Sequence, residues 1–139
     1  MKFLHTMLRV KDLKSALEFF VNKLGLVETR RMENETGRFT LVYLATAPGE
    51  PEVELTHNWD NQDDYPVGRF FGHIAFQVDD IYATCEALMA AGVLLHRPPR
   101  DGRMAFIKSP DGHPVELLQK GAALPLKAPW TEMPNVGTW

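Results

Sequence analysis

The stretch HTMLRVKDLKSALE (residues 5–18) aligns without a gap on HIAFQVDDIYATCE (residues 73–86). Histidine, valine, aspartate and glutamate occupy the same places in both copies. In each copy an alternating run, typical of a strand, leads into an aspartate, Asp12 or Asp80, that is suited to cap a helix. The chain therefore repeats itself, with a period that is too long for a solenoid and fits a duplicated module.

Each copy continues as an amphipathic helix. Apolar residues recur at helical spacing until Gly25 in the first copy and Gly92 in the second, and glycine commonly follows the last turn of a helix. We expect these helices to bury Leu13, Ala16, Leu17, Phe20 and Leu24 in the first copy, and Ile81, Cys85, Leu88 and Met89 in the second.

Strand-like runs follow each predicted helix, and both halves end on the same tripeptide, Val-Glu-Leu, at residues 53–55 and 115–117. The sequence thus predicts an α+β fold of two tandem βαβββ modules. The runs are VETRRM (27–32), RFTLVYLAT (38–46) and EVELTHN (52–58) in the first half, and VLLHR (93–97), RMAFIKS (103–109) and PVELLQK (114–120) in the second.

Four segments follow from this pattern. We expect module 1 over residues 1–57, a polar and turn-rich linker over 58–70, module 2 over 71–119 and an extended tail over 120–139. The tail holds Trp130 and Trp139, and we expect it to dock by its aromatic side chains.

Composition narrows the function. The 139 residues carry a net charge of -3 and show no face rich in Lys and Arg, so we expect no binding to nucleic acid. Cys85 is the single cysteine, which excludes an internal disulfide. The apolar stretches are too short for a signal peptide or a membrane span, so we expect a cytoplasmic protein without membrane contact.

The repeat also duplicates two metal-binding residue types. Each module carries a histidine at its first strand, His5 or His73, and a glutamate on its last strand, Glu54 or Glu116. A lone strand histidine is more often a core or surface residue, but recurrence at matching places argues against coincidence. Two imidazoles and two carboxylates suit Zn, Ni, Co or Fe, and leave positions open to hold a cis-enediolate through both oxygens.

Three further histidines, His57, His96 and His113, have no counterpart in the other module. We interpret them as structural or surface residues.

Several segments resemble the glyoxalase I branch of the vicinal oxygen chelate superfamily, over residues 1 to about 120. ELTHNW around Glu54 is the most specific of them. The resemblance implies a fold of cupped sheets and one divalent metal per site, held by His5, Glu54, His73 and Glu116. The similar segments are HTMLRV (5–10), FTLVYL (39–44), VELTHNWD (53–60), GHIAFQVDD (72–80) and AFIKSPDGHPVELL (105–118).

The resemblance also implies an activity, the isomerisation of the methylglyoxal–glutathione hemithioacetal to S-D-lactoylglutathione through a metal-bound enediolate. Glu116 is then the principal base, and Glu54 serves the opposite face of the substrate. Short members of the family are homodimers in which each site draws two ligands from each chain. The short chain resembles the nickel and cobalt class, so nickel is our first choice of metal, with cobalt and zinc open.

For glutathione as cosubstrate, Arg9 and Asn58 match family positions that hold the γ-glutamyl end, and Arg69 matches a glutathione-binding arginine of zinc-type members. The loop VLLHRPPRDGR (93–103) is about three residues shorter than its family counterpart. Arg97, Arg100 and Arg103 are therefore all candidates for the glycyl carboxylate, and the identity of the thiol stays open.

Two alternatives remain. One is another enzyme of the same superfamily, such as a fosfomycin-modifying thiol transferase or an extradiol dioxygenase; these use three protein ligands, and the fourth acid, Glu54, argues against them. The other is a metal-free binding protein on the same modules, which the intact set of two His and two Glu argues against.

Overall fold

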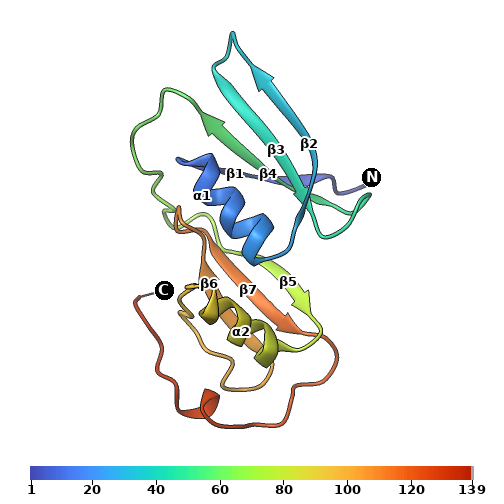
Figure 1. Ribbon diagram of the computed structural model, residues 1–139, viewed down its shortest axis with the longest axis vertical. Coiled ribbons are helices and arrows are strands. Elements are labelled where there is room, and N and C mark those ends of the chain that lie inside the picture. Colours follow the sequence, from blue (N-terminus) through green and yellow to red (C-terminus); the bar gives the residue numbers. More distant parts are fainter. Residues whose placement is uncertain (139) are drawn as a thin grey trace. The chain divides into compact units, whose positions relative to one another are not determined.

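The computed structural model describes residues 1–138, and Trp139 lies outside the described residues. The chain forms two compact units, Met1–Pro66 and a second that begins at Val67. The division falls within the segment predicted as a linker. Each unit is a small sheet with a helix packed on one face (Figure 1), so the prediction of an α+β fold of two modules is confirmed.

The first unit holds a four-stranded sheet in the order β1-β4-β3-β2. Strand β1 is parallel to β4, and the other neighbours are antiparallel. One face of the sheet carries the core, with Leu8, Val42 and Leu55 at 3% exposure or less. The strands are β1 (His5–Arg9), β2 (Val27–Asn34), β3 (Phe39–Ala45) and β4 (Glu52–Asn58).

The first helix differs in detail from its prediction. Asp12 caps α1 (Leu13–Leu17) by accepting a 2.6 Å hydrogen bond from the backbone N–H of Ser15, but the helix then continues as a π-helix, η1 (Glu18–Lys23). The wider π turn changes which positions face the sheet, so Phe19 is buried together with the predicted Ala16 and Phe20. Of the other predicted core residues, Leu13, Leu17 and Leu24 are only half-buried.

The second unit repeats this plan with fewer strands. Its sheet has the order β5-β7-β6, and β5 is parallel to β7 as β1 is to β4. The strand predicted over 93–97 is wrong in extent, because this stretch forms only a single bridge, Arg97 to Phe106. Two prolines follow at 98 and 99 and cannot donate the backbone hydrogen bonds that would extend it. The elements are β5 (Ile74–Val78), α2 (Ile81–Ala90), β6 (Met104–Lys108) and β7 (Pro114–Gln119).

Helix α2 is capped by Asp80, which accepts a 2.9 Å hydrogen bond from Ala83 N–H, and it buries Ile81, Cys85 and Leu88 as predicted. Met89 was expected in the core but is 44% exposed. Tyr82, which was not predicted in the core, is buried because Trp130 of the tail stacks on its ring.

The tail docks on the second unit through Trp130, as predicted. The indole is 2% exposed and stacks on Tyr82, with ring centroids 5.6 Å apart and planes 11° from parallel. Trp130 lies in the short 3-10 helix η2 (Trp130–Glu132). Backbone hydrogen bonds from Leu124 N–H to Gly102 O (2.9 Å) and from Val136 N–H to His96 O (3.0 Å) hold the tail on either side.

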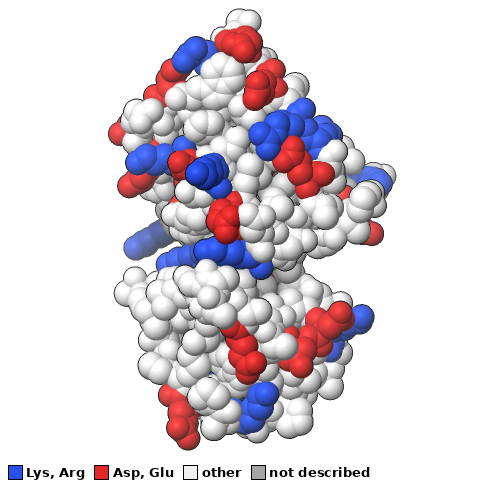
Figure 2. Space-filling model, in the orientation of Figure 1, with Lys and Arg blue, Asp and Glu red and all other residues white. Residues whose placement is uncertain are grey.

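Acidic and basic side chains are interspersed on the face of the first unit that Figure 2 presents. The ion pairs of the first unit include Arg38 with Asp60, Arg31 with Glu28 and Lys11 with Asp64. Among residues 1–138, no helix has the length and apolar character needed to cross a membrane.

Candidate functional site

Each unit brings one histidine and one glutamate together by the same construction. In the first unit Glu54 lies opposite Met7, two residues after His5, and the His5 Nε2 and Glu54 Oε2 atoms are 3.0 Å apart. In the second unit Glu116 lies opposite Ala75, two residues after His73, and the corresponding distance is 3.1 Å. The parallel pairing of the first and last strands of each module therefore makes two equivalent pairs.

The two members of each pair differ in exposure. The side chains of Glu54 and Glu116 are 11% and 14% exposed, whereas those of His5 and His73 are 35% and 42% exposed. A carboxylate this deep is costly without a partner, and here the imidazole supplies one. The open side of each imidazole leaves the pair accessible to a ligand.

The donor atoms fit a divalent metal. Nitrogen and oxygen ligands bind Zn²⁺ and similar ions at about 2.1 Å, so two ligands at right angles lie roughly 3 Å apart. Both pairs have this separation. Each unit by itself offers two ligands, and among residues 1–138 no three His, Cys, Asp or Glu side chains gather into one group.

Glu54 has an aromatic neighbour that our sequence interpretation missed. Tyr43 lies directly opposite Glu54 in the β3–β4 ladder, so its side chain lies on the same face of the sheet as that carboxylate. Burial, followed by the interaction of the hydroxyl with the neighbouring Glu54 carboxylate, raises the pKa of Tyr43. The signal was available in the sequence, since pairing FTLVYL with VELTHN in antiparallel register places this tyrosine beside the glutamate.

The tyrosine is itself held from its other face. The Arg30 guanidinium lies 3.3 Å from the centre of the Tyr43 ring and forms a 2.8 Å ion pair with Glu52. Beside these residues a pocket of about 730 Å³ opens on the first unit, and its lining includes His5, Thr29 and Arg30. The histidine of this half-site therefore borders a space large enough for a small molecule.

Arg9 and Asn58, both suggested for glutathione, come together in the first unit. Arg9 Nη1 donates a 2.6 Å hydrogen bond to Asn58 Oδ1, and Tyr65 Oη lies 3.5 Å from the same oxygen. Asn58 is four residues beyond Glu54 on β4, so the two side chains share a face of the strand.

The comparison with known families agrees with this geometry. The sequence model of the Glyoxalase/Bleomycin resistance protein/Dioxygenase superfamily matches residues 2–117. The chain belongs to this superfamily.

Similar proteins of the superfamily include lactoylglutathione lyases. The chain is 44% identical over 126 residues to the lactoylglutathione lyase of Haemophilus influenzae, with 86% of this chain and 93% of that protein covered. It is 41% identical over 129 residues to a probable lactoylglutathione lyase of Vibrio cholerae, with 88% and 93% covered. The resemblance to glyoxalase I drawn from the sequence is therefore confirmed.

A solved structure of the superfamily has the same fold. The trypanothione-dependent glyoxalase I of Leishmania major superposes with a TM-score of 0.81 at 32% identity, and 86% of each chain is covered.

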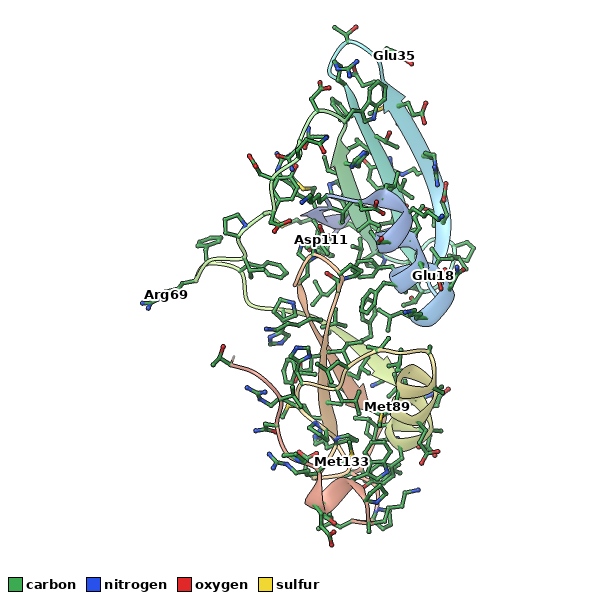
Figure 3. All side chains as sticks on the ribbon, turned by 60° about the vertical axis from the view of Figure 1, so that its left-hand side comes forward. Glu18, Glu35, Arg69, Met89, Asp111 and Met133 are labelled. Carbon is green, nitrogen blue, oxygen red and sulfur yellow. The ribbon has the colours of Figure 1, made fainter. Side chains whose placement is uncertain are left out.

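In the present chain, the arginines proposed for the glycyl carboxylate lie against its own C-terminal tail. Arg97 Nη1 donates to the His96 carbonyl (2.7 Å) and to the Val136 carbonyl (3.1 Å). Arg100 donates to Asn135 Oδ1 at 2.9 Å, and Arg103 to the Gly121 carbonyl at 3.4 Å. Arg69 lies elsewhere, on an exposed loop from which its side chain projects (Figure 3). A role for these arginines in binding substrate stays a prediction.

The three histidines without counterparts contact protein groups of their own unit. His57 Nδ1 lies 3.4 Å from the Val10 carbonyl, His96 Nδ1 lies 3.3 Å from the Leu94 carbonyl, and His113 Nδ1 lies 2.8 Å from Ser109 Oγ. Burial lowers the pKa of His96, which favours its neutral form. These contacts support a structural interpretation for all three.

Proposed function

We propose that this chain is a glyoxalase I, a lactoylglutathione lyase that converts the hemithioacetal of methylglyoxal and glutathione into S-D-lactoylglutathione. The observation that carries the proposal is the pair of equivalent His–Glu half-sites, His5 with Glu54 and His73 with Glu116, at 3.0 and 3.1 Å. Curated relatives that cover most of the chain carry the same activity in their names.

The residues divide the chemistry between them. His5, Glu54, His73 and Glu116 hold the divalent ion, which supplies Lewis-acid stabilisation of the charge that develops on the substrate oxygens. Glu116 takes the proton from C1 of the hemithioacetal and a proton returns at C2, while the hydroxyl proton passes from the oxygen on C1 to the oxygen on C2, so substrate and product are isomers. Glu54 lies on the opposite side of the substrate, and Arg9 with Asn58 binds the γ-glutamyl end through charge and amide groups.

The complete site is formed by two chains. In this homodimer the His5–Glu54 pair of one chain meets the His73–Glu116 pair of the other, so each dimer has two sites. Nickel is the proposed metal, because the ligand set suits Ni²⁺, Co²⁺ and Zn²⁺ and affinity rises from cobalt to nickel. The cytoplasm is the proposed compartment, which suits a chain whose single cysteine is buried and unpaired.

The activity is tested by following thioester absorbance at 240 nm after mixing the protein with methylglyoxal and glutathione, in the presence of nickel, cobalt or zinc. We expect turnover to depend on added metal and to be highest with nickel. Absence of a thioester with all three metals would refute the proposed function. The same assay with trypanothione in place of glutathione tests which thiol the protein uses, since the Leishmania major glyoxalase I of the same fold depends on trypanothione.

The shared site is tested by complementation. One variant loses the first pair (His5→Ala, Glu54→Gln) and another loses the second (His73→Ala, Glu116→Gln). Each alone is expected to be inactive. When both are co-expressed, half of the dimers are mixed, and each mixed dimer has one intact site, so activity should return to about a quarter of wild type. An inactive mixture that contains mixed dimers would contradict a shared site without affecting the assigned reaction.

A further inference from the structure

The two half-sites match in their backbone but differ in the groups beside the carboxylate. Tyr43 faces Glu54 across β3 and β4, and Phe106 faces Glu116 across β6 and β7. Both residues are 8% exposed. Each meets its histidine edge-on, with centroids 5.7 Å apart for Tyr43 and His5, and 5.3 Å apart for Phe106 and His73. The aromatic position is thus the same in both units except for one hydroxyl.

The first unit also has a second hydroxyl beside its glutamate that the second unit lacks. Thr56, two residues beyond Glu54, donates a 3.1 Å hydrogen bond from Oγ1 to Glu54 Oε1 and is buried. The residue two beyond Glu116 is Leu118, which has no polar group. Glu54 therefore has two hydroxyl neighbours, Tyr43 and Thr56, where Glu116 has Phe106 and Leu118.

The tyrosine is fixed well enough to orient a carboxylate. Arg30 stacks on its ring at 3.3 Å, Glu52 holds Arg30 by an ion pair, and Thr29 Oγ1 donates to the Tyr43 carbonyl at 3.2 Å. A carboxylate that accepts one hydrogen bond and faces a second, anchored hydroxyl-bearing side chain is restricted in rotation, whereas one flanked by apolar groups keeps its rotational freedom.

We propose that Tyr43 is a positioning residue that holds Glu54 in place as a metal ligand, and that the apolar surroundings of Glu116 leave that carboxylate free to move and to transfer the proton. The inference rests on the proposed function and explains why two equivalent glutamates take different tasks. It assigns Tyr43 no direct part in the chemistry.

The test exchanges the hydroxyl between the two units. Tyr43→Phe removes it and keeps the ring against His5 and Arg30, while Phe106→Tyr adds it beside Glu116. The first readout is the dissociation constant for Co²⁺, measured by competition with a chelator, together with the visible spectrum of the cobalt-loaded protein. We expect Tyr43→Phe to weaken cobalt binding about tenfold or more, which is the usual effect of removing a group that orients a ligand.

The second readout separates kcat from KM. Phe106→Tyr should bind cobalt at least as well as wild type but lower kcat about tenfold, because the new hydroxyl restrains the carboxylate that moves the proton. Thr56→Val should weaken cobalt binding in the same direction as Tyr43→Phe, and serves if the tyrosine variant does not fold.

Tyr82→Phe is the matched control. Tyr82 is 3% exposed and donates its hydroxyl to the Pro125 carbonyl in the second unit, so the substitution also removes a buried tyrosine hydroxyl but does not touch a half-site. This variant should keep wild-type cobalt affinity. Equal affinities in wild type and Tyr43→Phe would overturn the role of Tyr43 and leave the proposed reaction intact. A wild-type protein that neither binds cobalt nor forms thioester would overturn both.

Discussion

Arg9 and Asn58, from the first and last strands of the first unit, are joined by a 2.6 Å hydrogen bond between Nη1 and Oδ1. The bond leaves the remaining donors of the guanidinium free to bind a carboxylate. Arg9→Ala should raise KM for the hemithioacetal about 10- to 100-fold with little change in kcat, since a hydrogen bond to a charged group contributes about 1.5–3 kcal/mol. Steady-state kinetics with the metal at saturation measure this effect.

Arg38→Ala is the control for Arg9. Arg38 also belongs to the first unit and forms a 2.7 Å hydrogen bond to Asp60, but it is placed in no substrate contact. An equal rise of KM in both variants would show that the Arg9 effect is a general effect of lost charge.

Replacing Glu116 by glutamine keeps the shape of the side chain and removes the base. We expect Glu116→Gln to fold as the wild type, to retain metal and to lose turnover by about 10²- to 10⁴-fold, the usual contribution of a positioned general base. Metal analysis and the thioester assay on the same preparation give both quantities. Wild-type turnover in a metal-loaded Glu116→Gln protein would remove this residue from its role.

Gly102 fastens the tail to the second unit. Its φ is +68°, and a Cβ atom there would lie 2.2 Å from the Leu124 carbonyl oxygen, which is backbone and cannot move aside alone. Gly102→Ala should therefore cost about 3 kcal/mol or more of unfolding free energy and release the tail to protease. Gly121→Ala has a φ of +76° but no atom within 4 Å of the added Cβ, so only the backbone strain of about 1 kcal/mol is expected. Denaturant unfolding of both variants separates strain from collision.

Cys85 should be inert while the protein is folded. Burial raises the pKa of its thiol from 9.0 to about 12. Because the folded pKa lies above the unfolded one, the thiol contributes its full stabilisation below pH 9, and this contribution is lost as the pH rises through 12. At pH 8 the thiolate fraction is about a thousandfold lower in the folded protein, so a thiol reagent should label Cys85 only after denaturation. Rapid labelling of the native protein would contradict this.

Metal binding should stabilise the protein. At a metal concentration of 100 times Kd, binding adds about 2.7 kcal/mol, which raises Tm by roughly 10 °C for a chain of this size. A chelator should reverse the shift. His57→Ala is expected to keep the shift and His73→Ala to lose it, since His57 lies 3.4 Å from the backbone carbonyl of Val10 and belongs to neither His–Glu pair. A shift that survives in His73→Ala would place the metal elsewhere.

Much of the fold could be predicted because its signals are local. Asp12 and Asp80 cap their helices, and Gly25 and Gly92 follow them with φ of +79° and +78°. Which residues of the helices are buried was harder to predict. The π turn that buries Phe19, and the tail residue Trp130 that covers Tyr82 while Met89 stays exposed, depend on tertiary packing and leave no periodic signal.

In the candidate site, too, local patterns could be predicted and contacts that depend on tertiary packing could not. Strand alternation and the duplication of the module were enough to name His5, Glu54, His73 and Glu116 as one candidate set. The structure adds the pairing, because the parallel first and last strands bring each histidine to its own glutamate. The neighbours of Glu54 were missed, since Tyr43 belongs to a strand whose register was not assigned. The contacts of Arg97 with the tail were also beyond reach, because the tail has no periodicity from which its path could be read.

The equivalent registers of β1 with β4 and β5 with β7 have a consequence for substitutions. Each half of the chain keeps its histidine and glutamate in place by its own backbone pairing, so substitutions on β3 can retune one carboxylate without disturbing the other. The repeated backbone plan thus separates the placement of each His–Glu pair from the choice of the side chain opposite its glutamate, which is Tyr43 in one unit and Phe106 in the other.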